Sequence, residues 1–121
     1  MQRFKLVFFC PVPSTQGVLQ HLFAKFPRHV GRIGLYGGCA FVSRGTGQFT
    51  PLAGANPAIG SVGTQEYVEE NRVEVLVLPD SPAGPKQESR DSVQVTRVVE
   101  ELKKVHPYEE VAYDVYRLED F

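Results

Sequence analysis

The sequence predicts one α+β domain with a ferredoxin-like β-α-β-β-α-β order, in which both helices cover one face of an antiparallel sheet. Three observations support this prediction. The 121 residues are the length of a single domain, residues 1–121. Four short segments are rich in branched and aromatic residues, and two other segments repeat apolar residues with a helical period. Right-handed crossovers then place the first and third strands at the centre of the sheet, where we expect them to be parallel to each other.

The amino-terminal quarter of the chain predicts a central strand and a helix. Residues 5–10, KLVFFC, are a continuous apolar run that ends before Pro11, as in a strand covered on both faces. Pro13 and Ser14 are typical of a helix start, and Pro27 would end the helix. The helix has one apolar stripe, formed by Val18, Leu19, Leu22, Phe23 and Phe26.

The next segments predict a strand over residues 35–43 and an irregular loop over residues 45–63. The loop has no charged residue, and loops of this length are unusual in compact domains. Its apolar side chains need a surface to cover, so we expect an ordered loop packed on the body or on a neighbouring subunit. Its largest apolar residues, Phe49, Leu52 and Ile59, should then be mostly buried.

The second half of the chain repeats the pattern of strand, helix and strand. Residues 72–78, RVEVLVL, predict the other central strand, which residues 64–71 would extend. Residues 79–89 are a polar, proline-rich link, and residues 111–118, VAYDVYRL, predict the last strand.

A second helix is expected between that link and Pro107. Asp91 or Ser92 would cap its start. His106 follows its last turn, where the helix dipole favours the imidazolium form. Its buried stripe would consist of Val95, Val98, Val99, Leu102 and Val105.

The charge distribution excludes some classes of partner. The formal net charge is −1, which argues against nucleic acid binding. Residues 1–65 contain six basic and no acidic residues, whereas residues 66–121 contain fourteen acidic and seven basic ones. Because the charges are dispersed, we expect them to meet within the domain or between subunits.

The cysteines and the hydropathy suggest a cytoplasmic protein with reduced thiols. Cys10 and Cys39 are too few for a disulfide framework, and no secretory signal pattern precedes them. The sequence has no run of eighteen apolar residues, so no membrane-spanning helix and no membrane partner are expected.

The candidate chemistry centres on His106, Tyr108 and Glu109, just after the second helix. Glu109 would pair with the imidazole or join it as a metal ligand, and Tyr108 would donate a hydrogen bond. The structural alternative is a helix-ending motif in which His106 caps carbonyl groups. A thiolate at Cys39 together with His106 would suit copper or zinc if the two converge, within or across subunits. The alternative for Cys39 is a buried free thiol.

An anion site is a further candidate. Arg32 would form a modest basic cluster with Arg28 and Arg44, adequate for a small anion. Residues 45–47, Gly-Thr-Gly, would present N–H groups to such an anion, or simply make a tight turn. Asn56, which precedes Pro57 in the long loop, suits a turn and is counted as a ligand-binding candidate.

Two adjacent acidic pairs complete the candidates, Glu69-Glu70 and Glu109-Glu110. Neighbouring strand residues point to opposite faces, so neither pair is a catalytic dyad, and both are expected to be solvated or salt-bridged.

Three segments carry a resemblance to a known family. They are residues 29–41 (HVGRIGLYGGCAF), residues 45–63 (GTGQFTPLAGANPAIGSVG) and residues 105–116 (VHPYEEVAYDVY). Together they resemble the insert domain of YqfO-type proteins, the dinuclear-metal-centre hexameric family related to NGG-interacting factors. That insert is similar to CutA and PII proteins, and CutA proteins share the HPYE run of residues 106–109.

The resemblance implies a CutA/PII-like fold and, together with an apolar sheet whose helices cover only one face, a homotrimer or other closed oligomer. His106, Tyr108 and Glu109 occupy a helix–strand corner at the end of the sheet, so we expect them close to an intersubunit groove. The resemblance also implies the insert as a standalone protein. The parent proteins carry a metal domain with paired His and Glu ligands. This chain has three histidines and no such domain, so a type 2 GTP cyclohydrolase activity is not expected of it.

The sequence shows no recognisable combination of catalytic residues, so we expect an oligomeric regulatory module that binds a small molecule or a metal. Its partners would be copies of itself, and also a small anion or a protein. The alternative is an enzyme with His106 and Glu109 as acid and base, or a metal-binding protein with copper or zinc at a subunit interface.

Overall fold

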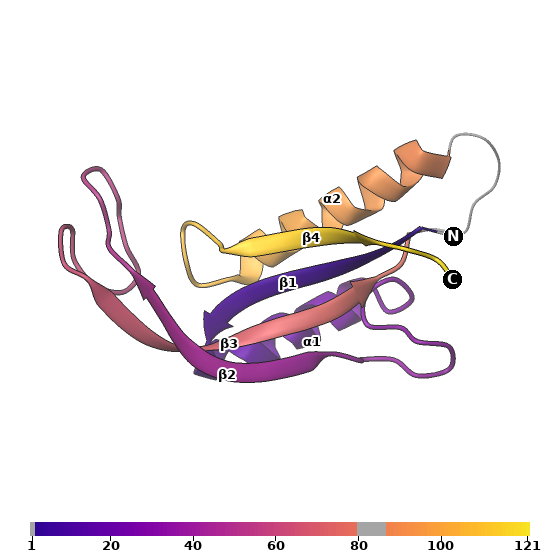
Figure 1. The fold of residues 1–121 in the computed structure, drawn as a ribbon, viewed down its shortest axis with the longest axis horizontal. Coiled ribbons are helices and arrows are strands. Elements are labelled where there is room, and N and C mark those ends of the chain that lie inside the picture. Colours follow the sequence, from indigo (N-terminus) through magenta and orange to yellow (C-terminus); the bar gives the residue numbers. More distant parts are fainter. Residues whose placement is uncertain (1, 80–86) are drawn as a thin grey trace.

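The computed structural model describes the backbone of residues 2–79 and 87–121, and the side chains of these residues except 87–94. It confirms the expected order of strands and helices. The elements are β1 (Arg3–Pro11), a 3-10 turn (Val12–Ser14), α1 (Thr15–Lys25), β2 (Phe41–Phe49), β3 (Glu66–Val77), α2 (Gln87–Val105) and β4 (Tyr113–Leu118) (Figure 1).

The four strands form one sheet in the order β2-β3-β1-β4, and all neighbouring strands are antiparallel. β1 and β3 lie at its centre, as expected, but they are antiparallel rather than parallel to each other. The crossover through α1 makes β1 parallel to β2. Because β3 lies between these two strands and pairs with both, it runs opposite to both.

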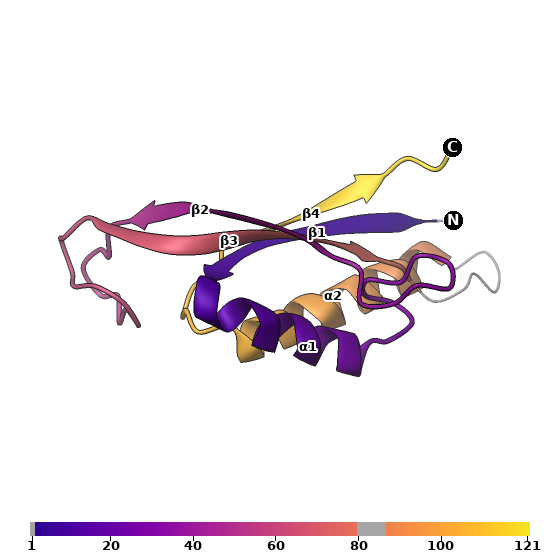
Figure 2. The ribbon, with the colours of Figure 1, turned by 90° about the horizontal axis from the view of Figure 1, so that it is seen from below.

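Both helices cover one face of the sheet, and the core lies between the two layers (Figure 2). The two apolar stripes are confirmed. The first is buried except for Phe23, which is partly buried, and the second buries Val98 and Leu102 and partly buries its other members. The fully enclosed core side chains include Leu6 and Phe8 from β1, Leu19 and Leu22 from α1, Val73, Val75 and Val77 from β3, and Val98 and Leu102 from α2.

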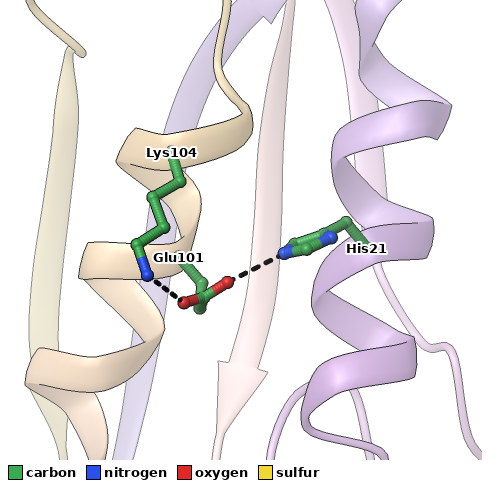
Figure 3. Close-up of polar contacts among 3 residues, drawn as sticks. All are labelled: His21, Glu101 and Lys104. Atoms are coloured by element: carbon green, nitrogen blue, oxygen red, sulfur yellow. Dashed lines mark hydrogen bonds and ion pairs between the residues drawn. The ribbon is translucent and has the colours of Figure 1, made fainter.

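A polar contact joins the two helices on the side away from the sheet (Figure 3). His21 Nε2 on α1 lies 3.0 Å from Glu101 Oε1 on α2, and Lys104 Nζ donates to Glu101 Oε2 at 3.0 Å. The hydrogen bonds from His21 and Lys104 lower the pKa of Glu101 to about 2. The Glu101 carboxylate therefore stays ionised and bridges α1 to α2.

The start of the second helix was wrongly predicted. α2 begins at Gln87, so Asp91 and Ser92 lie inside it rather than at its N-cap. The expected link over residues 79–89 is correspondingly shorter, and its residues 80–86 lie outside the described residues.

The second strand was also misplaced. β2 covers Phe41–Phe49 and not residues 35–43, because the preceding residues turn back on themselves. Gly31 has a φ of 71°, and a Cβ there would lie 2.8 Å from the carbonyl oxygen of Cys39. Only glycine allows this close approach of residues 31 and 39, which are also joined by a Cys39 N–H to Gly31 O hydrogen bond of 2.8 Å.

The first part of the expected loop is a strand instead. Residues 45–49 of β2 pair with residues 66–70 of β3 and extend the hairpin past the end of β1 (Figure 1). We call residues 45–69 the arm. The predicted extension of the third strand into residues 64–71 is confirmed from Glu66 onward.

The arm buries less apolar surface than expected. Phe49 is half-buried, but Leu52 is 73% exposed and Ile59 is exposed as well. The arm reaches beyond the helices, so most of its side chains do not lie over the core of this chain (Figure 2). Apolar side chains are also exposed on the helix-free face of the sheet, among them Phe41 at 65% and Tyr116 at 51%. None of the described helices is long and apolar enough to cross a membrane.

Candidate functional site

A cavity of about 500 Å³ lies between the arm and the turn that follows α2. Its walls are mainly apolar and come from Phe9 on β1, Ala112 before β4, and Phe49, Leu52, Pro57 and Ile59 of the arm. Its polar side chains include Glu70, Tyr108, Glu109 and Glu110. Segments far apart in the sequence thus form one concave site with a few polar groups, as small-molecule sites do.

Strand register brings Glu70 and Phe9 to this cavity. Phe9 pairs with Arg72, and Glu70 is two residues from Arg72 on β3, so both face away from the helix-covered core. On β2, Gly47 lies beneath the Glu70 carboxylate, whose Oε1 occupies the place where a Cβ of residue 47 would be. A glycine at position 47 therefore lets Glu70 lie across β2.

Tyr108 fastens the turn after α2 to the arm. Its hydroxyl donates to Glu70 Oε2 at 2.9 Å, and its ring centroid lies 6.0 Å from that of Phe49. Burial and the hydrogen bond to Glu70 raise the pKa of Tyr108. The phenol therefore remains a hydrogen-bond donor rather than a base.

Glu109 makes a second link between the same two segments. Its Oε1 accepts the backbone N–H of Asn56 at 2.9 Å. Asn56 thus lies between the lining residues Ala55 and Pro57, and it contacts Glu109 through its backbone N–H and not its side-chain amide.

His106 lies behind Tyr108 and supports it. The side chain is only 6% exposed. Its Nε2 donates to the carbonyl oxygen of Phe9 at 2.6 Å, and its Nδ1 accepts the backbone N–H of Tyr108 at 3.1 Å. Both nitrogens are therefore used, and one of them must be unprotonated. The geometry fits the helix-ending alternative, in which His106 shapes the turn.

The expected imidazolium form of His106 was wrong. Burial lowers the pKa of His106, and this effect outweighs the hydrogen bond to Phe9 and the negative charge of Glu70, which raise it. The ring is neutral at neutral pH because burial destabilises its charged form more than the dipole at the helix end stabilises it.

Acidification is expected to destabilise the fold through His106. The folded-state pKa lies below the ordinary value of 6.5, so the unfolded chain binds the proton first. The contribution of neutral His106 to the free energy of unfolding is complete above the unfolded-state pKa and is lost as the pH falls below that pKa. Urea unfolding at about pH 7.5, 6.5 and 5.5 measures this loss. His106→Gln, which cannot gain a proton, should show a smaller loss, and equal losses in both proteins would contradict the prediction.

The structure does not bring Cys39 or Arg32 to the cavity. The backbone of Cys39 is hydrogen-bonded to Gly31, and Gly31 is hydrogen-bonded to Leu76 of β3. His106 is instead hydrogen-bonded to Phe9, which pairs with Arg72 of β3. Four residues of β3 separate these two levels, about 13 Å. A single chain therefore does not provide the expected Cys39–His106 metal pair. In the described part of the chain, no three His, Cys, Asp or Glu side chains are placed to hold a metal ion.

The structure also separates Arg32 and Arg44, two of the three members of the predicted basic cluster. Arg32 Nε donates to the carbonyl oxygen of Gly34 within its own turn, whereas Arg44 pairs with Glu69 on the arm at 2.8 Å. Residues 45–47 are neither a tight turn nor a phosphate loop, because they lie within β2 and pair with residues 68–70.

Glu70 is the site residue that sequence reasoning missed. The expectation of a salt bridge holds for Glu69, which pairs with Arg44, but Glu70 accepts from a phenol inside the cavity. Strand alternation already separates the two side chains. What the sequence lacked was the position of β2, which places Gly47 under Glu70.

Comparisons with known proteins give relatives over nearly the whole chain. No family model matches the sequence. Proteins named GTP cyclohydrolase 1 type 2 homolog are 39% identical over 115 residues in Halalkalibacterium halodurans and 40% identical over 114 residues in Mycobacterium tuberculosis. These alignments cover 95% and 94% of this chain but only 27% and 26% of the relatives. The chain thus spans about a quarter of their length.

Solved structures show the same fold. A Bacillus cereus protein related to NIF3 has a TM-score of 0.71 and 34% identity, and the match covers 98% of this chain and 26% of that one. The periplasmic divalent cation tolerance protein CutA from Archaeoglobus fulgidus has a TM-score of 0.61 at 15% identity, covering 100% and 87%. The Bacillus subtilis GlnK–ATP complex has a TM-score of 0.52 at 17% identity, covering 97% and 82%.

CutA and GlnK therefore resemble this chain in fold, whereas the NIF3-related protein is similar to it in sequence as well. The chain is therefore a homologue of about a quarter of the length of the NIF3-related proteins named GTP cyclohydrolase 1 type 2 homolog.

Proposed function

We propose that the chain is a self-associating, non-catalytic module that binds a small molecule in the cavity beside the arm. The observation that carries the proposal is the cavity itself. Two hydrogen bonds, Tyr108–Glu70 and Glu109–Asn56, hold its opposite walls together at 2.9 Å each. Such a preformed concave site with a mostly apolar lining is suited to binding.

The state of the ionisable groups supports binding rather than catalysis. The pKa of Tyr108 is raised, so its phenol keeps its proton, and His106 uses both ring nitrogens within the fold. A general acid or base must reach a substrate with a proton or a lone pair. His106 is enclosed behind Tyr108, so an acid–base role for His106 with Glu109 finds no support in this geometry.

Exposed apolar side chains support self-association. Phe41 and Tyr116 lie on the helix-free face of the sheet, and Leu52 and Tyr67 lie on the arm. Apolar patches of this kind mark interfaces. A second copy of the chain would cover them, and the resemblance to CutA favours a closed homotrimer. We place this assembly in the cytoplasm, where the thiols of Cys10 and Cys39 would stay reduced.

Sedimentation velocity tests the assembly. The chain is expected to sediment as a trimer at micromolar concentrations, and Phe41→Ser on the sheet face should shift it toward monomer. Leu35→Ser removes an even more exposed apolar side chain, 92% against 65%, from the turn before β2 and serves as the control, which should leave the trimer intact. A wild-type monomer at all concentrations would overturn the self-association.

A further inference from the structure

We infer that the cavity takes an organic cation with an apolar body, such as a protonated aryl-alkyl amine. The inference rests on the proposed function, because it names the ligand class of the same cavity. The charge of the cavity and the chemistry of its walls support it independently.

The charged groups of the cavity are all negative. Glu70, Glu109 and Glu110 line it, and no Lys, Arg or His is among the described residues that do so. Two of these carboxylates are oriented by uncharged donors, the Tyr108 hydroxyl and the Asn56 N–H. A cation entering here would meet acceptors that are already positioned.

Three acidic residues elsewhere in the described chain are paired with basic side chains. Glu69 binds Arg44, Glu101 binds Lys104, and Glu74 faces Arg72 at 3.8 Å. Arg72 is the base nearest to the cavity along β3, but its guanidinium lies over the ring of Phe9 at 5.7 Å and beside Glu74. The fold therefore compensates these acids with its own bases, whereas the cavity carboxylates are left to a ligand.

The walls fit an apolar body attached to that cation. Phe49 and Tyr108 form an aromatic corner with their rings tilted at 55°, directly beside the Glu70 carboxylate. Aromatic faces attract a cation, and a cation next to a carboxylate gains from both. Leu52 and Ile59 supply aliphatic surface on the arm side. The volume of about 500 Å³ is that of a site for a drug-sized molecule.

The same features oppose an anion. A phosphate or carboxylate ligand would bring a like charge next to three glutamates in a partly apolar site, where such repulsion is poorly screened. The small anion expected from the sequence depended on a cluster of Arg28, Arg32 and Arg44. Arg32 follows Gly31, which bonds to Leu76 near the other end of β3, and Arg44 is paired with Glu69. A nucleotide is excluded from this cavity by the same argument.

Three probes that share one body and differ in charge test the inference. They are 4-phenylbutylamine, 4-phenylbutanol and 4-phenylbutyrate, titrated into the full chain and followed by amide resonances of the arm. The amine is expected to bind at least about tenfold more tightly than the alcohol and to weaken with added salt. The carboxylate is expected not to bind. Equal or tighter binding of the carboxylate would overturn the ligand class and leave the proposed function standing.

Two variants separate the cavity charge from general electrostatics. Glu70→Gln keeps the acceptor for Tyr108 and should weaken the amine about tenfold while leaving the alcohol unchanged. Glu69→Gln removes the same charge one residue away, on the opposite face, and should change neither. Equal effects of the two variants would overturn the role of Glu70. If none of the probes binds, the proposed function itself fails. If the amine binds only when the protein is diluted to monomer, a second copy of the chain fills the cavity in the assembly, and the ligand inference fails.

Discussion

Replacing His106 by alanine is expected to lower the free energy of unfolding by about 2–4 kcal/mol, because two buried backbone groups lose their partners. The Phe9 carbonyl would lose its donor, and the Tyr108 N–H would lose its acceptor. The turn that carries Tyr108 and Glu109 would then detach from β1, and the cavity would lose a wall. Chemical denaturation at pH 7.5 measures the effect.

The matched control is His21→Ala. His21 makes one hydrogen bond, to Glu101, where His106 makes two, and its side chain is 38% exposed. Its loss should cost no more than about 1 kcal/mol. A second readout separates a turn-shaping role from simple packing: in His106→Ala the amide of Tyr108 should exchange rapidly, while amides in α1 stay protected. Comparable losses for the two histidines would contradict the prediction.

Gly31→Ala is expected to cost about 2–3 kcal/mol. Residue 31 has a positive φ of 71°, where an L side chain is strained. The new Cβ would also lie 2.6 Å from Phe23 Cε1 and 2.8 Å from the backbone oxygen of Cys39. The aromatic ring can move, but the Cys39 carbonyl is fixed by the turn. The thermal unfolding midpoint should fall by roughly ten degrees or more.

Gly17→Ala is the corresponding control. Gly17 lies in α1 and a Cβ there meets nothing within 4 Å. Alanine at this position should stabilise the chain by about 0.5–1 kcal/mol, since glycine is a poor helix former. The two glycine substitutions should therefore have opposite signs. A neutral Gly31→Ala would mean that the turn before β2 rearranges without cost.

The central strands and the helices were predictable because the structure that their residues favour locally is also the one that buries their apolar side chains in the core. The KLVFFC run and the RVEVLVL run are apolar enough to be buried wherever they pair, and the stripes of α1 and α2 have the helical period. Edge features were less predictable. Residues 45–47 have little strand propensity, and they form part of β2 only because β3 supplies a long partner.

The cavity was predictable only in part. Tyr108 and Glu109 do line it, and Glu109 accepts a hydrogen bond from Asn56, which lies between two lining residues and 53 residues away in the sequence. Arg32 and Cys39 were grouped with them because a sequence gives no distances between turns. Glu70 was overlooked for the same reason, since its role depends on the register between β2 and β3.

The position of β1 has a consequence for how the chain folds. β1 is the first strand in the sequence, yet it pairs with residues 70–77 and with the last strand, where Arg3 lies opposite Leu118. Contacts between such distant residues form only after a large loop has closed. The chain loses this conformational entropy before the contacts stabilise it, which slows folding. During synthesis the KLVFFC segment is complete long before either of its partners. Apolar segments exposed in this way are prone to aggregate, and charged or proline residues at their borders limit that risk. Lys5 and Pro11 occupy those borders here.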